Sequence, residues 1–118
     1  QKWYNAMNKK INVVFFRTEA GNEPVREWLL SLDKEDKKAI GVDVKTVEYG
    51  WPIGMPVCRP LGKGLYEVRS HISHKRIARV IFSIIDNHMI LLHGFIKKTQ
   101  KTPKEEIALA LKRVKETK

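Results

Sequence analysis

The sequence predicts a small α+β domain, with an N-terminal helical hairpin and a C-terminal helix packed on a mostly antiparallel sheet. The chain has 118 residues, which suffices for one hydrophobic core. Apolar residues make up 42% of the composition, so the chain can bury enough surface to fold. Segments rich in β-branched residues and segments with helical spacing of apolar residues follow one another in the order β-α-α-β-β-β-α.

The first residues differ from the rest of the chain. Asn5 and Ala6, just before Met7, are typical of a remnant of an expression vector. We therefore expect residues 1–6 to be a vector-derived or disordered leader and residues 7–118 to form a single domain. Within that domain, the β-branched and aromatic residues 12–17 predict a short first strand.

Two helices should follow this strand. Pro24 suits the first turn of a helix because its missing N–H is not needed there, and apolar residues recur at helical spacing as far as Leu32. Asp33 is a candidate N-cap for a second helix over residues 34–49, which Gly50 ends. We expect the two helices to form a hairpin that covers one face of the sheet.

The other strands and the last helix lie beyond residue 64. Residues 51–64 contain three prolines and three glycines, so we expect a structured loop there. Strands are predicted over residues 65–72, 75–86 and 89–97, and their short links predict antiparallel hairpins. Thr102 and Pro103 should begin the last helix as its cap and first residue, with Glu105 completing a capping box.

Positive charge is concentrated in the second half of the chain. The whole chain has 23 Lys and Arg against 13 Asp and Glu, a net charge of +10. Residues 59–118 hold 14 basic against 5 acidic side chains, whereas residues 1–58 hold 9 and 8. This imbalance predicts a partner with dense negative charge, such as nucleic acid, an anionic membrane or an acidic protein.

Several classes of protein and site are disfavoured. Cys58 is the single cysteine, which excludes an internal disulfide and fits a reducing cytoplasm. No apolar run approaches the ~20 residues that a bilayer span needs, so we expect no membrane association. The four histidines lack the i, i+4 spacing of a zinc protease, and the basic half offers almost no carboxylates. We therefore expect neither a metal nor a cofactor.

Arginines inside predicted strands are the sharpest functional signal. Arg79 interrupts an otherwise apolar row in the middle of one strand, and Arg69 lies in the strand before it, beside Glu67. One interpretation is a structural ion pair of Glu67 with Arg79 or Arg69 on adjacent strands. The other is a rigid guanidinium directed at a phosphate, which its planar fork binds at two points. RNA can be cleaved without a metal when such groups neutralise the transition state.

Three motifs carry a family resemblance. From Leu61 onward the chain resembles the RelE/HigB superfamily of toxins from type II toxin–antitoxin systems, in particular its phage-derived HigB-like branch. The stretches that carry the likeness are Leu61-Gly62-Lys63-Gly64-Leu65-Tyr66-Glu67-Val68-Arg69, Arg79-Val80-Ile81-Phe82-Ser83-Ile84-Ile85-Asp86, and Leu91-Leu92-His93-Gly94-Phe95-Ile96-Lys97-Lys98-Thr99-Gln100-Lys101-Thr102-Pro103.

The resemblance implies a RelE-like fold and a ribosome-dependent endoribonuclease, an mRNA interferase that inhibits translation. By position it implies catalytic roles for Arg79, Lys97, Lys98 and Arg69. Other groups of the second half are expected to bind RNA, namely Lys63, His71, Lys75, Arg76 and Lys101. The implied partners are mRNA on the ribosome and a cognate helix-turn-helix antitoxin.

The acid and base of the reaction do not carry over, because no tyrosine follows Tyr66. His71, His74 and His93 are candidates, since an imidazole titrates near working pH. His93, within its strand, fits better a hydrogen-bonded histidine that belongs to the core or supports another site residue. Two alternatives stay open: a ParE-like toxin that binds a protein target such as gyrase, and an inactive nucleic-acid-binding relative. Trp3, Trp28 and Trp51 would suit a partner interface, but large aromatics in a small domain more often belong to the core.

Overall fold

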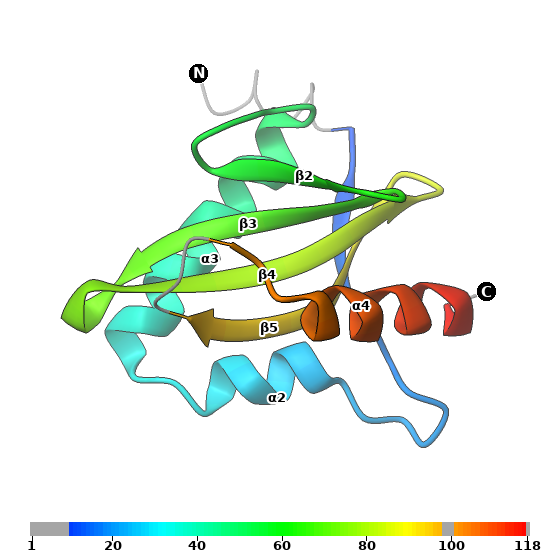
Figure 1. The fold of residues 1–118 in the computed structure, drawn as a ribbon, viewed down its shortest axis with the longest axis horizontal. Coiled ribbons are helices and arrows are strands. Elements are labelled where there is room, and N and C mark those ends of the chain that lie inside the picture. The colour runs from blue at the N-terminus through cyan, green and yellow to red at the C-terminus, as the bar shows by residue number, and fades with distance from the viewer. Residues whose placement is uncertain (1–9, 98–100, 118) are drawn as a thin grey trace.

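The protein is an α+β domain built on one five-stranded sheet, as the computed structural model in Figure 1 shows. The structure describes residues 10–97 and 101–117, so the leader expected at residues 1–6, Trp3 and Lys98 lie outside the described residues. The strands lie in the order β1-β5-β4-β3-β2. All neighbouring pairs are antiparallel except β1 and β5, which run parallel. The predicted fold class is confirmed.

The predicted strands form close to their expected bounds. The bounds are Asn12–Phe15 for β1, Leu65–Ile72 for β3, Arg76–Ile85 for β4 and His88–Lys97 for β5. Lys75, predicted to begin a strand, instead ends the short 3-10 turn Ser73–Lys75 and has a φ of 57°. The alternation predicted for β4 is confirmed, because Ala78, Val80 and Phe82 join one core while Ile81 joins the other.

One strand was missed. Residues 58–62, predicted as part of a loop, form β2 (Cys58–Gly62) and pair with β3. The strand tolerates Pro60 because β2 is the last strand of the sheet, where a missing N–H costs no ladder bond on the open side. The register of the pair shifts between Pro60 and Gly62, so the glycine lies at an irregularity.

The two predicted helices are α2 (Pro24–Leu30) and α3 (Lys34–Gly50), and both cover one face of the sheet. We call this the hairpin face, formed by Tyr66, Val68, Ala78, Val80 and Phe82. The buried residues of α3 include Ile40, Val44 and Val47, which recur at helical spacing, and Trp28 of α2 lies directly on Gly94. Trp51 packs edge-on against Tyr66 and Phe82, so both described tryptophans serve the core.

The last helix, α4 (Lys104–Glu116), lies on the opposite side of the sheet, in front of it in Figure 1, with α3 behind. We call this the α4 face, formed by Leu65, Glu67, Arg69, Arg79 and Ile81. Fully buried Ala110 and the predicted stripe of Ile107, Leu111 and Val114 pack there. The predicted Thr102 cap is wrong: Pro103 takes the N-cap position, without a side-chain bond. Among the described residues, no helix is long and apolar enough to cross a membrane.

Candidate nucleic-acid interface

Strand register brings two predicted catalytic arginines side by side. Arg69 of β3 and Arg79 of β4 are direct cross-strand partners, so their side chains leave the sheet on the same face. In the next row of that face, Arg59 of β2 lies opposite Glu67 of β3. We call Arg59, Arg69 and Arg79 the arginine cluster. Like charges at facing strand positions repel one another, so this arrangement lowers stability unless something compensates for it.

The three arginines of the cluster differ in how much of each side chain is exposed. Arg79 and Glu67 are both 0% exposed, whereas Arg59 and Arg69 are half-buried. Burial lowers the pKa of Arg79, Glu67 opposes that change, and the nearby Arg69 and Arg59 lower the pKa further. Arginine nevertheless stays charged at neutral pH. Glu67 therefore compensates part of a buried positive charge, as the structural interpretation of these residues expects.

Glu67 also fixes the chain segment that leads into α4. The Thr102 hydroxyl donates a hydrogen bond to Oε2 of Glu67 at 2.5 Å, which explains why it does not cap the helix. The other carboxylate oxygen, Oε1, is buried and has no hydrogen-bond partner among the described residues. Such an incompletely satisfied buried carboxylate costs stability. The segment just before α4 is thus anchored to the sheet beside the arginine cluster.

A histidine–carboxylate pair lies on the same face. His93 of β5 is opposite Ile81 of β4, in the row of Glu67 and Arg59. Its Nε2 lies 2.5 Å from Oε1 of Glu106 in α4, and its ring stacks on Phe95 with ring centroids 5.4 Å apart. The side chains of His93 and Glu106 are 16% and 23% exposed. His93 is therefore a mostly buried histidine with a hydrogen-bond partner, and a catalytic role for it stays a prediction.

Other predicted residues lie near the cluster. Lys97 pairs through its backbone with Ile77, one row beyond Arg79. His71 follows Arg69 on the same face of β3 and is exposed. Lys101 and Arg59 line a cavity of about 190 Å³ together with Thr102 and Ile107. For Lys98 the predicted role remains untested, since this residue lies outside the described ones.

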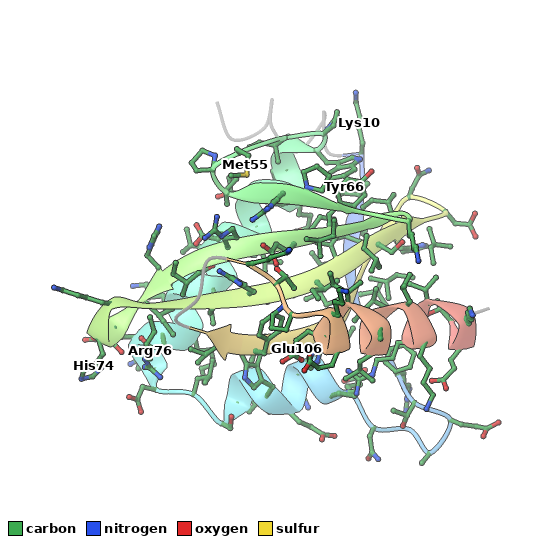
Figure 2. All side chains as sticks on the ribbon, in the orientation of Figure 1. Lys10, Met55, Tyr66, His74, Arg76 and Glu106 are labelled. Carbon is green, nitrogen blue, oxygen red and sulfur yellow. The ribbon has the colours of Figure 1, made fainter. Side chains whose placement is uncertain are left out.

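Three predicted RNA-binding residues lie away from the cluster. Lys63 is exposed in the β2–β3 turn, where its φ is 56°, and Lys75 is exposed in the β3–β4 link. Arg76 is on the hairpin face, where its Nη2 bonds Asp36 of α3 at 3.0 Å. Figure 2 shows Arg76 beside His74 at the tip of the β3–β4 hairpin, well apart from Glu106 at the start of α4.

Two residues of the site were absent from the predicted set. Arg59 lies in the proline-rich segment whose composition predicts a loop, so the sequence does not indicate on which face of the sheet its side chain lies. Glu106 lies in the last helix, and nothing in the sequence pairs it with His93. Among the described residues, no three His, Cys, Asp or Glu side chains lie close enough to hold a metal ion.

Comparison with known proteins places the chain in a family. No curated protein matches it. Residues 27–115 match the family described as Phage derived protein Gp49-like (DUF891), so the match spans the second half of α2, all of α3, the strands of the site and most of α4. The chain therefore belongs to the phage-derived Gp49-like proteins, a toxin-like family of toxin–antitoxin systems.

Proposed function

We propose that this protein is the toxin of a type II toxin–antitoxin system and acts as a metal-independent, ribosome-dependent endoribonuclease that cleaves mRNA. The observation that carries the proposal is the cross-strand pair of Arg69 and Arg79, extended by Arg59, on one face of a rigid sheet. Membership of a toxin-like family supports the same conclusion. The proposed setting is the cytoplasm, with a helix-turn-helix antitoxin as the neutralising partner.

The proposed chemistry is attack by a ribose 2′-hydroxyl on the adjacent phosphorus. The enzyme must hold the nucleotide in line and neutralise the charge that develops on the phosphoryl oxygens. The half-buried Arg69 and Arg59 can reach a phosphate as they stand, and a guanidinium fork binds two of its oxygens at once. Arg79 lies beneath them and adds positive potential, which is stronger in a site that excludes water.

The basic residues around the arginine cluster contribute to RNA binding in different ways in this proposal. Lys97, whose backbone pairs with Ile77 in the row beyond Arg79, and Lys98 supply further positive charge in this proposal. His71 and Lys101 extend the contact with RNA, while Lys63 and Lys75 contact RNA at the two ends of β3. Arg76 is left out of the interface, because its guanidinium holds Asp36 on the other face.

The test is Arg69→Ala with Arg26→Ala as the matched control. Both changes remove one arginine and the same charge, but Arg26 lies on the exposed side of α2, 57% exposed. Induced expression of the wild-type protein and of Arg26→Ala should arrest growth and produce discrete cuts in translated mRNA, read by primer extension. Arg69→Ala should reduce cleavage by about 100-fold or more, the cost of losing one transition-state donor. Equal cleavage by the two variants would contradict the proposal.

The complete burial of Arg79 favours a second candidate. A guanidinium that contacts no solvent, next to a buried carboxylate, also fits a purely structural role. The basic face would then be the interface of a ParE-like toxin that binds a protein target such as gyrase. Growth arrest with intact mRNA would favour this candidate. Salt-dependent RNA binding without arrest or cleavage would instead indicate an inactive relative.

A further inference from the structure

The proposed reaction lacks a proton acceptor among the arginines, and the pair of His93 and Glu106 offers one. Arginine stays protonated at working pH and has no acceptor atom. A histidine whose second nitrogen is held by a carboxylate is a common arrangement for moving protons, because the carboxylate sets the tautomer and orients the ring. The pair lies on the same face as the arginine cluster.

The hydrogen bond decides which nitrogen is available. An ionised carboxylate only accepts, so Nε2 of His93 must donate its hydrogen to Oε1 of Glu106. In a neutral imidazole the other nitrogen, Nδ1, then carries the lone pair. No hydrogen bond to Nδ1 is formed within residues 10–97 and 101–117, and the side chain keeps 16% of its surface in solvent. Nδ1 is the atom that can accept a proton from a substrate.

The sheet places this atom next to the phosphate-binding groups. Phe95, on which His93 stacks, is the cross-strand partner of Arg79, so His93 is the diagonal neighbour of Arg79. Diagonal neighbours have Cα atoms about 7–8 Å apart, within reach of long side chains. A phosphate held by the cluster and a ribose beside Phe95 would bring the 2′-hydroxyl to the imidazole.

Few other charges surround the imidazole. From α4 it meets Glu106, and Arg113 donates to the carbonyl of the preceding residue, Leu92. From the sheet, Arg79 is its diagonal neighbour and Glu67 lies two strands away in its row. Strand β1 contributes only Asn, Val and Phe side chains, and α2 packs through Trp28 on the other face of β5. Among the described residues, Glu106 is therefore the charged side chain in direct contact with the imidazole.

We propose that His93 is the general base of the reaction and that Glu106 is its positioning residue; this inference rests on the proposed nuclease function. Nδ1 of His93 takes the 2′-hydroxyl proton as the 2′-oxygen bonds to phosphorus. The bond from phosphorus to the 5′-oxygen breaks, and that oxygen leaves with the electron pair and takes a proton from water. The hydroxide so formed recovers the proton from His93. The products are a 2′,3′-cyclic phosphate and a 5′-hydroxyl end.

The test measures cleavage of mRNA on translating ribosomes by purified protein across a pH series. A base must be unprotonated, so wild-type cleavage should fall as the pH is lowered. His93→Gln should lose about 100-fold or more and lose this acid limb. Glu106→Gln still accepts the Nε2 hydrogen bond but no longer stabilises the imidazolium. Its acid limb should therefore move to lower pH.

His88→Gln is the matched control, because His88 is exposed at the start of β5, where it pairs with Ile85, whereas His93 pairs with Ile81. It should keep the wild-type rate and profile. Folded His93→Gln or Glu106→Gln protein with an unchanged profile would overturn the inference, since a clamp between α4 and β5 would alter stability but not the acid limb. If the wild-type protein cuts no message, the nuclease proposal itself fails and this assignment fails with it.

Discussion

Two arginines three residues apart on β4 lie in opposite surroundings. Arg76, on the hairpin face, bonds Asp36, while Asp36 also accepts bonds from the backbone N–H and hydroxyl of Ser73. Arg79, on the α4 face, is fully buried near Arg69 and Arg59, with Glu67 as its nearby carboxylate.

The two regions differ in how completely their buried charges are compensated. The charges around Arg76 stabilise the fold, whereas those around Arg79 are only partly compensated. At the hairpin tip each oxygen of the Asp36 carboxylate is bonded, so the network ties α3 to the β3–β4 link. On the α4 face, Glu67 keeps one oxygen without a hydrogen bond among the described residues, and positive groups outnumber it. Such an arrangement is retained most readily where a ligand supplies the missing negative charge.

The largest effect that tests this comparison is expected from Arg79→Met. Removing the guanidinium leaves the Glu67 carboxylate buried without its compensating charge, so the free energy of unfolding should fall by about 3–5 kcal/mol. Adding Glu67→Gln should restore most of that loss, because both buried charges are then gone. Urea unfolding of the two single variants and the double variant measures the coupling. Additive losses would show that Glu67 does not compensate Arg79.

The second prediction concerns the close packing of α2 on the hairpin face. A Cβ added at Gly94 would lie 2.3 Å from Cε3 of Trp28, so Gly94→Ala forces α2 away from β5. We expect a loss of about 1–3 kcal/mol in thermal unfolding. Gly41→Ala is the matched control: it lies inside α3 with nothing within 4 Å of its added Cβ, and it should raise stability by about 1 kcal/mol. Equal effects would show that α2 is not closely packed there.

The sequence predicts the order and type of the helices and strands well, but it predicts the site less completely. Period-two alternation in β4 correctly separates the faces of Arg76 and Arg79, because alternation is a property of the strand backbone. It does not reveal the burial of Arg79, which depends on what later segments of the chain lie over the sheet. The pairing of His93 with Glu106 likewise depends on how α4 docks.

The errors have equally local causes. Prolines and glycines indicate a loop at β2 unless the strand is known to lie at the edge of a sheet, and this hid the position of Arg59. Thr102 has the residue type and position of a helix cap, but a buried carboxylate competes for its hydroxyl. In both cases a tertiary partner overrides a local preference.

The smallest of these effects concerns pH and tests whether the Asp36 network belongs to the fold. Bonding from the Ser73 backbone lowers the pKa of Asp36, against the opposing effect of burial, with the Ser73 hydroxyl, Arg76 and His74 also lowering it. A carboxyl whose pKa is lower in the folded state stabilises the protein above its unfolded pKa, about 3.9, and loses that contribution as the pH falls through the folded value.

Unfolding measured below about pH 4 should therefore show a steeper loss of stability for the wild type than for Asp36→Asn. The exposed Asp33→Asn, which changes a residue whose side chain makes no capping bond, should retain the wild-type slope. Identical slopes for all three proteins would mean that the Asp36 carboxylate does not contribute to the stability of the fold.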